Sequence, residues 1–156
     1  MSDPAFLESN IQIQTTLDTD GVSRHVRSNV EHSLMRRGGV ISVQVLNKFA
    51  NVARRKLRRA WLEIMRSLSD IRALFRPPVP LTLATHVAAV ALAVKYGFSF
   101  YDALIVASAL EAGCTILLSE DMHDGLVVEG RLTVRNPFRR RHTSLLGSST
   151  HIGRQR

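Results

Sequence analysis

The sequence predicts an α/β fold in which a central parallel sheet is covered by helices. Between residues 38 and 138, stretches with helical periodicity alternate with short apolar stretches of strand length. Glycine and proline residues separate these stretches and place turns between them. This alternation is typical of parallel strands, because a parallel strand needs a long crossover, usually a helix, to return to the same edge of the sheet.

The first expected helix follows a short buried stretch at residues 38–41, and Ser42 is expected to cap it. Apolar residues recur at helical spacing through this helix. They are Val43, Leu46, Phe49, Ala50, Ala53 and Leu57. A second helix is expected over residues 61–75. Its predicted inward-facing residues are Leu62, Met65, Leu68, Ile71 and Phe75.

Two further helices and three short strands are expected after the second helix. The helices are expected at residues 84–96 and 101–112, and the strands at residues 79–83, 115–119 and 131–135. Three prolines near residue 78 end the second helix, and Gly97 ends the third. Residues 131–135 alternate in the manner of an edge strand.

The two ends of the chain differ from this middle part. Residues 1–37 show no sustained helical period, and only residues 11–17 alternate well enough for a strand. We expect a divergent N-terminal segment at 1–37, which is poorly ordered at least in part. One α/β domain follows at 38–138, and residues 139–156 form a basic flexible tail.

Charge and cysteine content indicate which kinds of binding partner and which cellular location to expect. The net charge is +8, with 21 Lys and Arg against 13 Asp and Glu. This balance favours polyanionic partners, although a solvated helix face is an equal alternative for the basic cluster at 54–59. The single cysteine, Cys114, excludes an intramolecular disulfide. We expect a cytoplasmic protein, since the sequence shows neither a signal layout nor an apolar run long enough to span a membrane.

Asp102 and Asp121 are the best candidates for chemistry. A helix from Asp102 to residue 112 climbs about 15 Å, and a strand at 115–121 returns roughly 20 Å. The two carboxylates should therefore meet at one end of the unit, where they could hold a hard divalent cation. The alternative for Asp102 is structural, because Ser99-x-x-Asp102 matches a helix capping box. Glu120 should face away from Asp121, since neighbouring strand residues point to opposite faces.

Several motifs resemble the PIN-domain family, in the style of VapC-type toxins of bacterial toxin–antitoxin pairs. The resemblance covers about residues 38–138 and includes the Tyr-Asp-Ala-Leu-Ile and Leu-Ser-Glu-Asp motifs around Asp102 and Asp121. The other matching segments are 40–56 (Val-Ile-Ser-Val-Gln-Val-Leu-Asn-x-Phe-x-Asn-Val-Ala-Arg-Arg-Lys), 80–86 (Pro-Leu-Thr-Leu-Ala-Thr-His), 110–114 (Leu-Glu-Ala-Gly-Cys) and 130–138 (Gly-Arg-Leu-x-Val-x-Asn-Pro-Phe).

The resemblance implies a PIN-like three-layer fold and an endoribonuclease that uses Mg²⁺ or Mn²⁺ held by clustered acids. Asp102 and Asp121 fall on the family's third and fourth acidic positions, which makes them the implied catalytic residues and metal ligands. It further implies an antitoxin and a second copy of the chain as partners. The basic cluster would then attract RNA through phosphate contacts. Its residues are Arg54, Arg55, Lys56, Arg58 and Arg59.

Two positions depart from the family pattern. The family's first aspartate has only a weak echo at Asp18, and Lys48 replaces the family's glutamate in the helix after Ser42. A lysine there puts positive charge where a metal would sit and opposes cation binding. A shifted reading frame upstream of Gly38 would explain the unusual start, and translating the other two frames tests that idea.

Three hypotheses follow from these observations. The preferred one is a metal-dependent, VapC-like endoribonuclease whose activity Lys48 impairs. The competing one is a protein of the same fold that binds RNA or an antitoxin without cleavage. The third is an unrelated α/β domain in which Asp102 only caps a helix.

Overall fold

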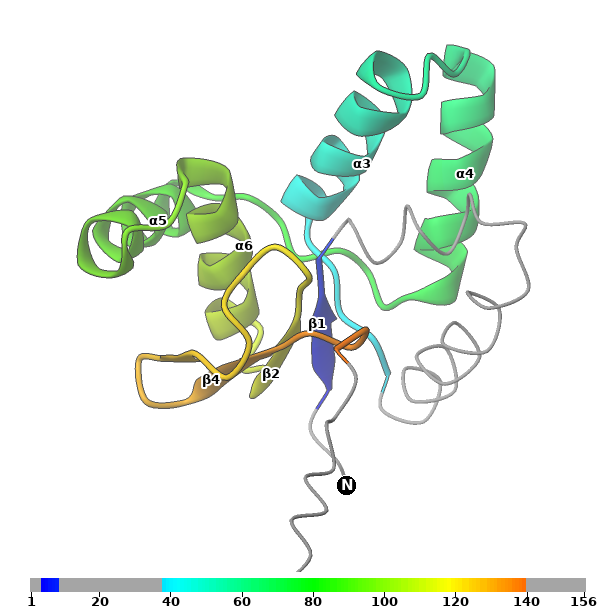
Figure 1. Cartoon of the computed structure of the whole chain (residues 1–156). Helices are drawn as coiled ribbons and strands as arrows, with labels where there is room; N and C mark the ends of the chain where they lie inside the picture. Colours follow the sequence, from blue (N-terminus) through cyan, green and yellow to red (C-terminus); the bar gives the residue numbers. More distant parts are fainter. Residues whose placement is uncertain (1–3, 9–37, 140–156) are drawn as a thin grey trace, which may run out of the picture.

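The computed structural model describes residues 4–8 and 38–139. Among these residues, a four-stranded sheet lies at the centre of the fold (Figure 1). Its strands lie in the order β1-β2-β4-β3. They are β1 (Ala5–Leu7), β2 (Ile116–Leu118), β3 (Val127–Val128) and β4 (Leu132–Arg135). β1, β2 and β4 are mutually parallel, whereas β3 pairs antiparallel with β4. The predicted α/β fold with a parallel sheet is confirmed, with one antiparallel strand added at an edge.

β1 is paired along both of its sides. On one side Leu7 lies in register with Leu118 of β2. On the other side the Leu7 N–H donates to the carbonyl of Val40 at 2.9 Å. The Val79 N–H then donates to the carbonyl of Ile41 at 2.8 Å, so two short bridging segments continue the parallel ladder. A strand of three residues thus occupies an interior position, with Phe6 fully buried.

In the part of the chain that the structure describes, four helices flank the sheet in two pairs (Figure 1). They are α3 (Val43–Arg55), α4 (Trp61–Leu74), α5 (Leu83–Tyr96) and α6 (Phe100–Glu111). In the view of Figure 1, α3 and α4 form a hairpin on one side of β1, and α5 and α6 lie on the other. Residues 103–110 of α6 are all buried. This stretch is almost entirely apolar because no face of it meets water, whereas Tyr101 in the first turn is exposed.

Local signals set the helix ends as expected. The Ser42 hydroxyl accepts a hydrogen bond from the Val45 N–H at 3.4 Å and caps α3. Gly97 ends α5 with a φ of 72°, a left-handed conformation that costs glycine little. Gly39 meets a different demand, since a Cβ there would lie 2.7 Å from the Phe75 ring. The chain can therefore pass this close to α4 only because residue 39 has no side chain.

The predicted inner face of α4 is wrong for two residues. Leu62 and Met65 are exposed, whereas Ile64 and Ile71 are buried. The buried Ile64 and Ile71 and the partly buried Leu68 and Phe75 follow the helical spacing 64, 68, 71 and 75, so the true apolar stripe is rotated relative to the predicted one. The sequence offered two overlapping stripes on this helix, and contact with the core selected one of them.

The predicted edge position of residues 131–135 is also wrong. β4 lies between β2 and β3, and its Leu132 and Val134 side chains are fully buried. The two residues of β3 form the edge instead. The strand expected at 79–83 is reduced to a single bridge at Val79, and the strand expected at 11–17 lies outside the described residues, as does nearly all of the basic tail.

Within the described ranges, no helix alone has the length and apolar character needed to cross a membrane. Only α5 and α6 taken together meet that test, as a pair bent by 115°.

Candidate functional site

The carboxyl ends of β1 and β2 converge on one edge of the sheet and carry acidic residues there. Glu8 directly follows β1, and Asp121 lies three residues beyond β2. Because Leu7 and Leu118 are in register in parallel strands, both acids lie at the same end of the sheet, where the carboxyl ends of β1 and β2 meet. Asp102 lies in the first turn of α6, and Lys48 projects from α3. Ligands of α/β proteins commonly bind at such an edge.

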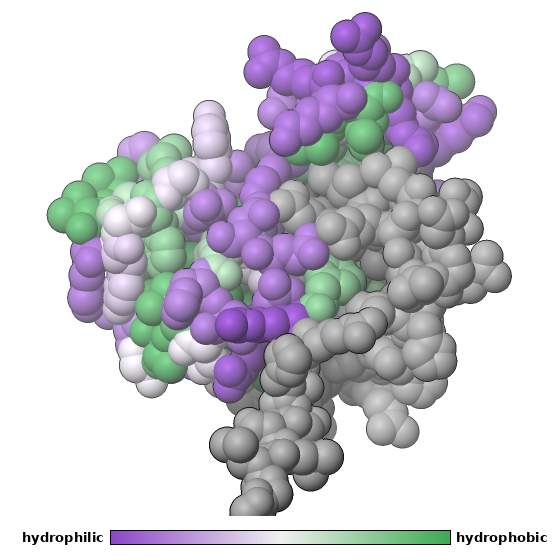
Figure 2. All heavy atoms as spheres, in the orientation of Figure 1, coloured by the Kyte–Doolittle hydropathy of each residue, from purple (hydrophilic) through white to green (hydrophobic). Residues whose placement is uncertain are grey.

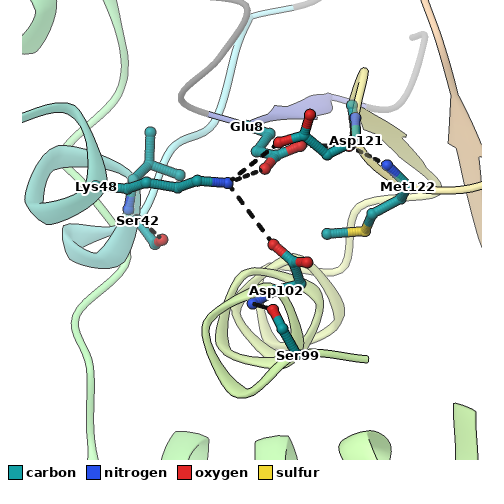
Figure 3. Close-up of polar contacts among 9 residues, drawn as sticks. Glu8, Ser42, Lys48, Ser99, Asp102, Asp121 and Met122 are labelled. Carbon is teal, nitrogen blue, oxygen red and sulfur yellow. Dashed lines mark hydrogen bonds and ion pairs between the residues drawn. The ribbon is translucent and has the colours of Figure 1, made fainter. Parts of the chain in front are cut away.

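The Lys48 ammonium lies at the centre of these three carboxylates (Figure 3). Its Nζ atom is 2.5 Å from Glu8 Oε1, 3.5 Å from Asp121 Oδ2 and 3.7 Å from Asp102 Oδ1. The structure therefore brings Asp102 and Asp121 around one shared cation, and that cation belongs to the protein. Three carboxylates and one ammonium leave the cluster with a formal charge of −2.

Glu8 is the most buried member of the cluster. Its side chain is 0% exposed, whereas that of Lys48 is 22% exposed. The Ser119 hydroxyl donates to Glu8 Oε2 and accepts from the N–H groups of Asp121 and Met122, at 3.2 and 3.1 Å. Ser119 thus ties the turn that carries Asp121 to the carboxylate of Glu8.

Burial and charge act in opposite directions on the Glu8–Lys48 pair. Burial raises the pKa of Glu8 above its usual value of 4.5, and the hydrogen bonds from Lys48 and Ser119 only partly oppose this. Burial by itself lowers the pKa of Lys48. The hydrogen bond to Glu8 and the charges of the three carboxylates outweigh burial and raise that pKa above 10.5. The ammonium is therefore charged throughout the neutral range.

The capping hypothesis for Asp102 accounts for its backbone but not for its side chain. Ser99 Oγ accepts from the Asp102 N–H at 3.2 Å, which is one half of a capping box. The Asp102 carboxylate itself points toward Lys48 (Figure 3). Nearby Asp124 is engaged elsewhere, because its Oδ1 atom accepts from the Asn136 N–H at 2.9 Å.

The cluster does not fit a divalent cation while Lys48 remains in place. Mg²⁺ requires oxygen ligands at about 2.0–2.1 Å in a near-octahedral arrangement, and the space among these carboxylates is taken by an ammonium. Within residues 4–8 and 38–139, no group of three or more acidic, His or Cys side chains is arranged to hold a metal. The predicted role of Asp102 and Asp121 as catalytic metal ligands stays a prediction.

Sequence reasoning missed Glu8. The family's first acidic position was assigned to the neighbourhood of Asp18, which lies outside the described residues. The available signal was Ala5-Phe6-Leu7-Glu8, a short apolar run that ends in an acid. Leu117 and Leu118 form a similar short apolar run, which Asp121 follows after Ser119 and Glu120. A run of three apolar residues is too short to show a strand period, so this signal was weak.

The predicted RNA-binding residues lie away from the acidic cluster. Arg54 and Arg55 form the last turn of α3, and Lys56, Arg58 and Arg59 follow in the turn to α4. Arg55 is seven positions beyond Lys48, which is roughly 10 Å along the helix. In Figure 2, hydrophilic residues gather over this end of the α3–α4 hairpin.

Comparison with known proteins supports the resemblance found in the sequence. The family model of the PIN domain matches residues 5–123, so the match includes β1 and Glu8 as well as the segment after Gly38. Comparison with curated proteins gave no match.

Among solved structures, the chain is similar to VapC20 of Mycobacterium tuberculosis, described as a toxin that cleaves the sarcin–ricin loop. The TM-score is 0.58 at 16% sequence identity, over 75% of this chain and 89% of that one. At this identity the likeness concerns the fold.

Proposed function

The chain belongs to the PIN-domain family. We propose that it is a VapC-like protein that binds RNA and lacks metal-dependent ribonuclease activity. One observation carries this proposal: the Lys48 Nζ lies within 3.7 Å of Glu8, Asp102 and Asp121. An ammonium at that position occupies the space among the carboxylates and cancels one of their three negative charges, so it opposes the binding of a metal cation there. It supplies no exchangeable ligand positions for activating water, which are what a catalytic metal provides.

Binding to RNA is supported by the charge of the whole chain. The net charge of +8 favours association with phosphates, since their neutralisation releases counterions. The acidic cluster cannot supply this attraction, because it keeps a formal charge of −2. We therefore place RNA contact outside the cluster. The cytoplasmic location expected from the sequence is part of the same proposal.

A second candidate function is the Mg²⁺- or Mn²⁺-dependent endoribonuclease that the family resemblance implies. The convergence of Asp102 and Asp121 at one edge of the sheet favours it. It requires Lys48 to leave the cluster and give up its contact with Glu8. The two functions therefore differ in the position of Lys48, which stays among the carboxylates in the first and leaves them in the second.

We expect the wild-type protein to bind RNA but to show no Mn²⁺-dependent cleavage. The Lys48→Glu variant should gain Mn²⁺ binding, because a fourth carboxylate replaces the ammonium. At a Mn²⁺ concentration a hundred times its Kd, binding should stabilise that variant by about 2.7 kcal/mol. Calorimetric titration and thermal unfolding with and without Mn²⁺ measure both effects, and gel analysis of labelled RNA measures cleavage.

An Asp102→Asn variant is the matched control for cleavage. Wild-type cleavage that needs Mn²⁺ and is lost in Asp102→Asn would overturn the proposal in favour of the endoribonuclease. If Lys48→Glu binds Mn²⁺ no better than wild type, the lysine is not what excludes the metal. Cleavage gained by Lys48→Glu and removed again in Lys48→Glu/Asp102→Asn would support the account given above.

A second copy of the chain is a proposed partner at α5. Four exposed apolar residues follow one face of this helix at the spacing of a coiled-coil seam. They are Leu83, Val87, Val90 and Val94. The stripe is uncharged, and such a face can meet its own copy across a two-fold axis. In Figure 2, apolar residues gather over the α5 end of the molecule. An antitoxin partner rests on the family resemblance alone.

Replacing Val94, which is 84% exposed, by Glu should weaken self-association at least tenfold. The free energy of unfolding should change by no more than about 0.5 kcal/mol, since the site is on the surface. Analytical ultracentrifugation over a concentration series measures the effect. The exposed Leu74 of α4 provides the control, and Leu74→Glu should leave association unchanged. A wild-type protein that stays monomeric throughout would refute this partner.

A further inference from the structure

The turn between α3 and α4 combines dense positive charge with an exposed aromatic ring. Five cations lie within six residues, and we call them the basic turn: Arg54, Arg55, Lys56, Arg58 and Arg59. The first four are exposed and Arg59 is half-buried. Trp61, the first residue of α4, is 57% exposed and is the only tryptophan in the sequence.

Two contacts fix the ring and one cation relative to each other. The Arg54 guanidinium carbon lies 5.7 Å from the centroid of the Trp61 ring. The same guanidinium donates through Nη1 to the carbonyl of Arg59 at 3.1 Å. Arg54 is therefore held against the indole by a hydrogen bond across the turn. The arrangement is formed before any ligand binds, which lowers the entropic cost of binding.

Helix stability explains only part of this charge. Arg54 and Arg55 in the last turn of α3 interact favourably with the carboxyl end of the helix dipole. Lys56, Arg58 and Arg59 lie beyond that helix. Within the described residues, no carboxylate forms an ion pair with any member of the basic turn. Most of this positive charge is thus available to an external anion.

We propose that the basic turn and Trp61 form a binding site for single-stranded RNA. The cations contact successive phosphates, and an unpaired base stacks on the indole. Every base has a π face, so such stacking tolerates many sequences, whereas bases inside a duplex are not accessible to it. This inference rests on the proposed RNA-binding function and adds the location of the site and the strandedness of the ligand.

The unique tryptophan gives a direct readout in the full-length protein. Titration with a mixed-sequence single-stranded RNA should quench the fluorescence of Trp61, and duplex RNA of equal length should not. Anisotropy of the labelled RNA reports binding independently of the indole. Trp61→Ala should weaken single-strand binding about tenfold, which corresponds to about 1.4 kcal/mol and is usual for the loss of one stacked base. Trp61→Phe should keep part of the affinity.

Matched variants separate stacking and charge from general surface effects. Leu62→Ala removes a neighbouring side chain of similar exposure, 59%, and should leave the RNA affinity unchanged. Arg55→Gln should lower the slope of log K against log[salt] by about 0.7 for a single strand. Arg72→Gln removes an exposed charge at the far end of α4 and should not alter that slope.

Each outcome decides between clear alternatives. If RNA binds by anisotropy but Trp61 is not quenched and Trp61→Ala binds normally, this site is refuted while the RNA-binding function stands. If no RNA binds at all, the proposed function fails as well. If poly-glutamate quenches Trp61 and competes as well as RNA does, the turn is a site for acidic proteins and the proposal is overturned.

Discussion

Replacing Lys48 by Met should lower the free energy of unfolding by about 3–5 kcal/mol, the usual cost of leaving a buried charge without its partner. The carboxylate of Glu8 is fully buried and lies 2.5 Å from the Lys48 ammonium. Methionine fills a similar volume but cannot donate a hydrogen bond. Urea-induced unfolding of both proteins at neutral pH measures the difference.

A double variant tests whether the loss comes from the pair. Adding Glu8→Gln to Lys48→Met removes the buried charge while keeping an acceptor for the Ser119 hydroxyl. The double variant should recover most of the stability lost in Lys48→Met, because replacing both members of a buried pair by neutral groups is often nearly neutral. Equal destabilisation in the single and double variants would show that the lysine acts through packing alone.

The pH dependence of stability provides a separate check on the same pair. The raised pKa of Glu8 means that the folded state holds its proton more tightly than the unfolded state. This contribution is complete below pH 4.5 and is lost as the pH rises through the raised pKa. Removing Lys48 should raise the pKa of Glu8 further. The decline in stability should then extend to higher pH in Lys48→Met than in wild type.

Lys48 contributes at the opposite end of the pH scale. Its raised pKa keeps its contribution to stability intact up to pH 10.5, and that contribution is lost as the pH rises through the folded-state pKa. The difference between wild type and Lys48→Met isolates this effect, since the exposed Lys95, whose pKa is also raised, is common to both proteins.

Phe6→Ala should cost about 3–5 kcal/mol, as is usual for deleting a large aromatic side chain from a core. Phe6 is fully buried, and its strand is hydrogen-bonded on both sides. The loss would show that residues 5–7, and not only the segment after Gly38, are needed for the folded domain. Thermal or urea-induced unfolding gives the value.

The exposed Leu74 at the end of α4 is the matched control for this measurement. Leu74→Ala also removes a large apolar side chain but should change stability by no more than about 0.5 kcal/mol. If Phe6→Ala is as mild as Leu74→Ala, β1 does not stabilise the domain. The position of Glu8 beside Lys48 would then lose its structural support.

Much of the fold could be predicted because its signals are local. The Ser42 cap, the Gly97 stop and the periodicity of residues 43–55 act within a few residues of the chain, and the structure confirms the helices they define. The meeting of Asp102 and Asp121 was also predictable. One helix and one strand connect them, and fixed rises per residue set where they return.

The inner face of α4 and the place of β4 were not predictable in this way. Ile64 and Leu62 lie on overlapping apolar stripes, and only the position of the neighbouring helix decides which of them is covered. An alternating strand such as β4 takes an interior or an edge place according to which strands pair with it. Those pairings join residues far apart in sequence.

Residue patterns were enough to predict the α/β class, the helix boundaries to within about two residues, and the replacement of an expected acid by Lys48. The pairing of this lysine with Glu8, 40 residues away along the chain, became visible only in the folded molecule. The reason is physical. β1 has too few residues to show a period, and it is held by hydrogen bonds to Val40 on one side and to β2 on the other. Those long-range contacts bury Glu8 and bring its carboxylate to the ammonium.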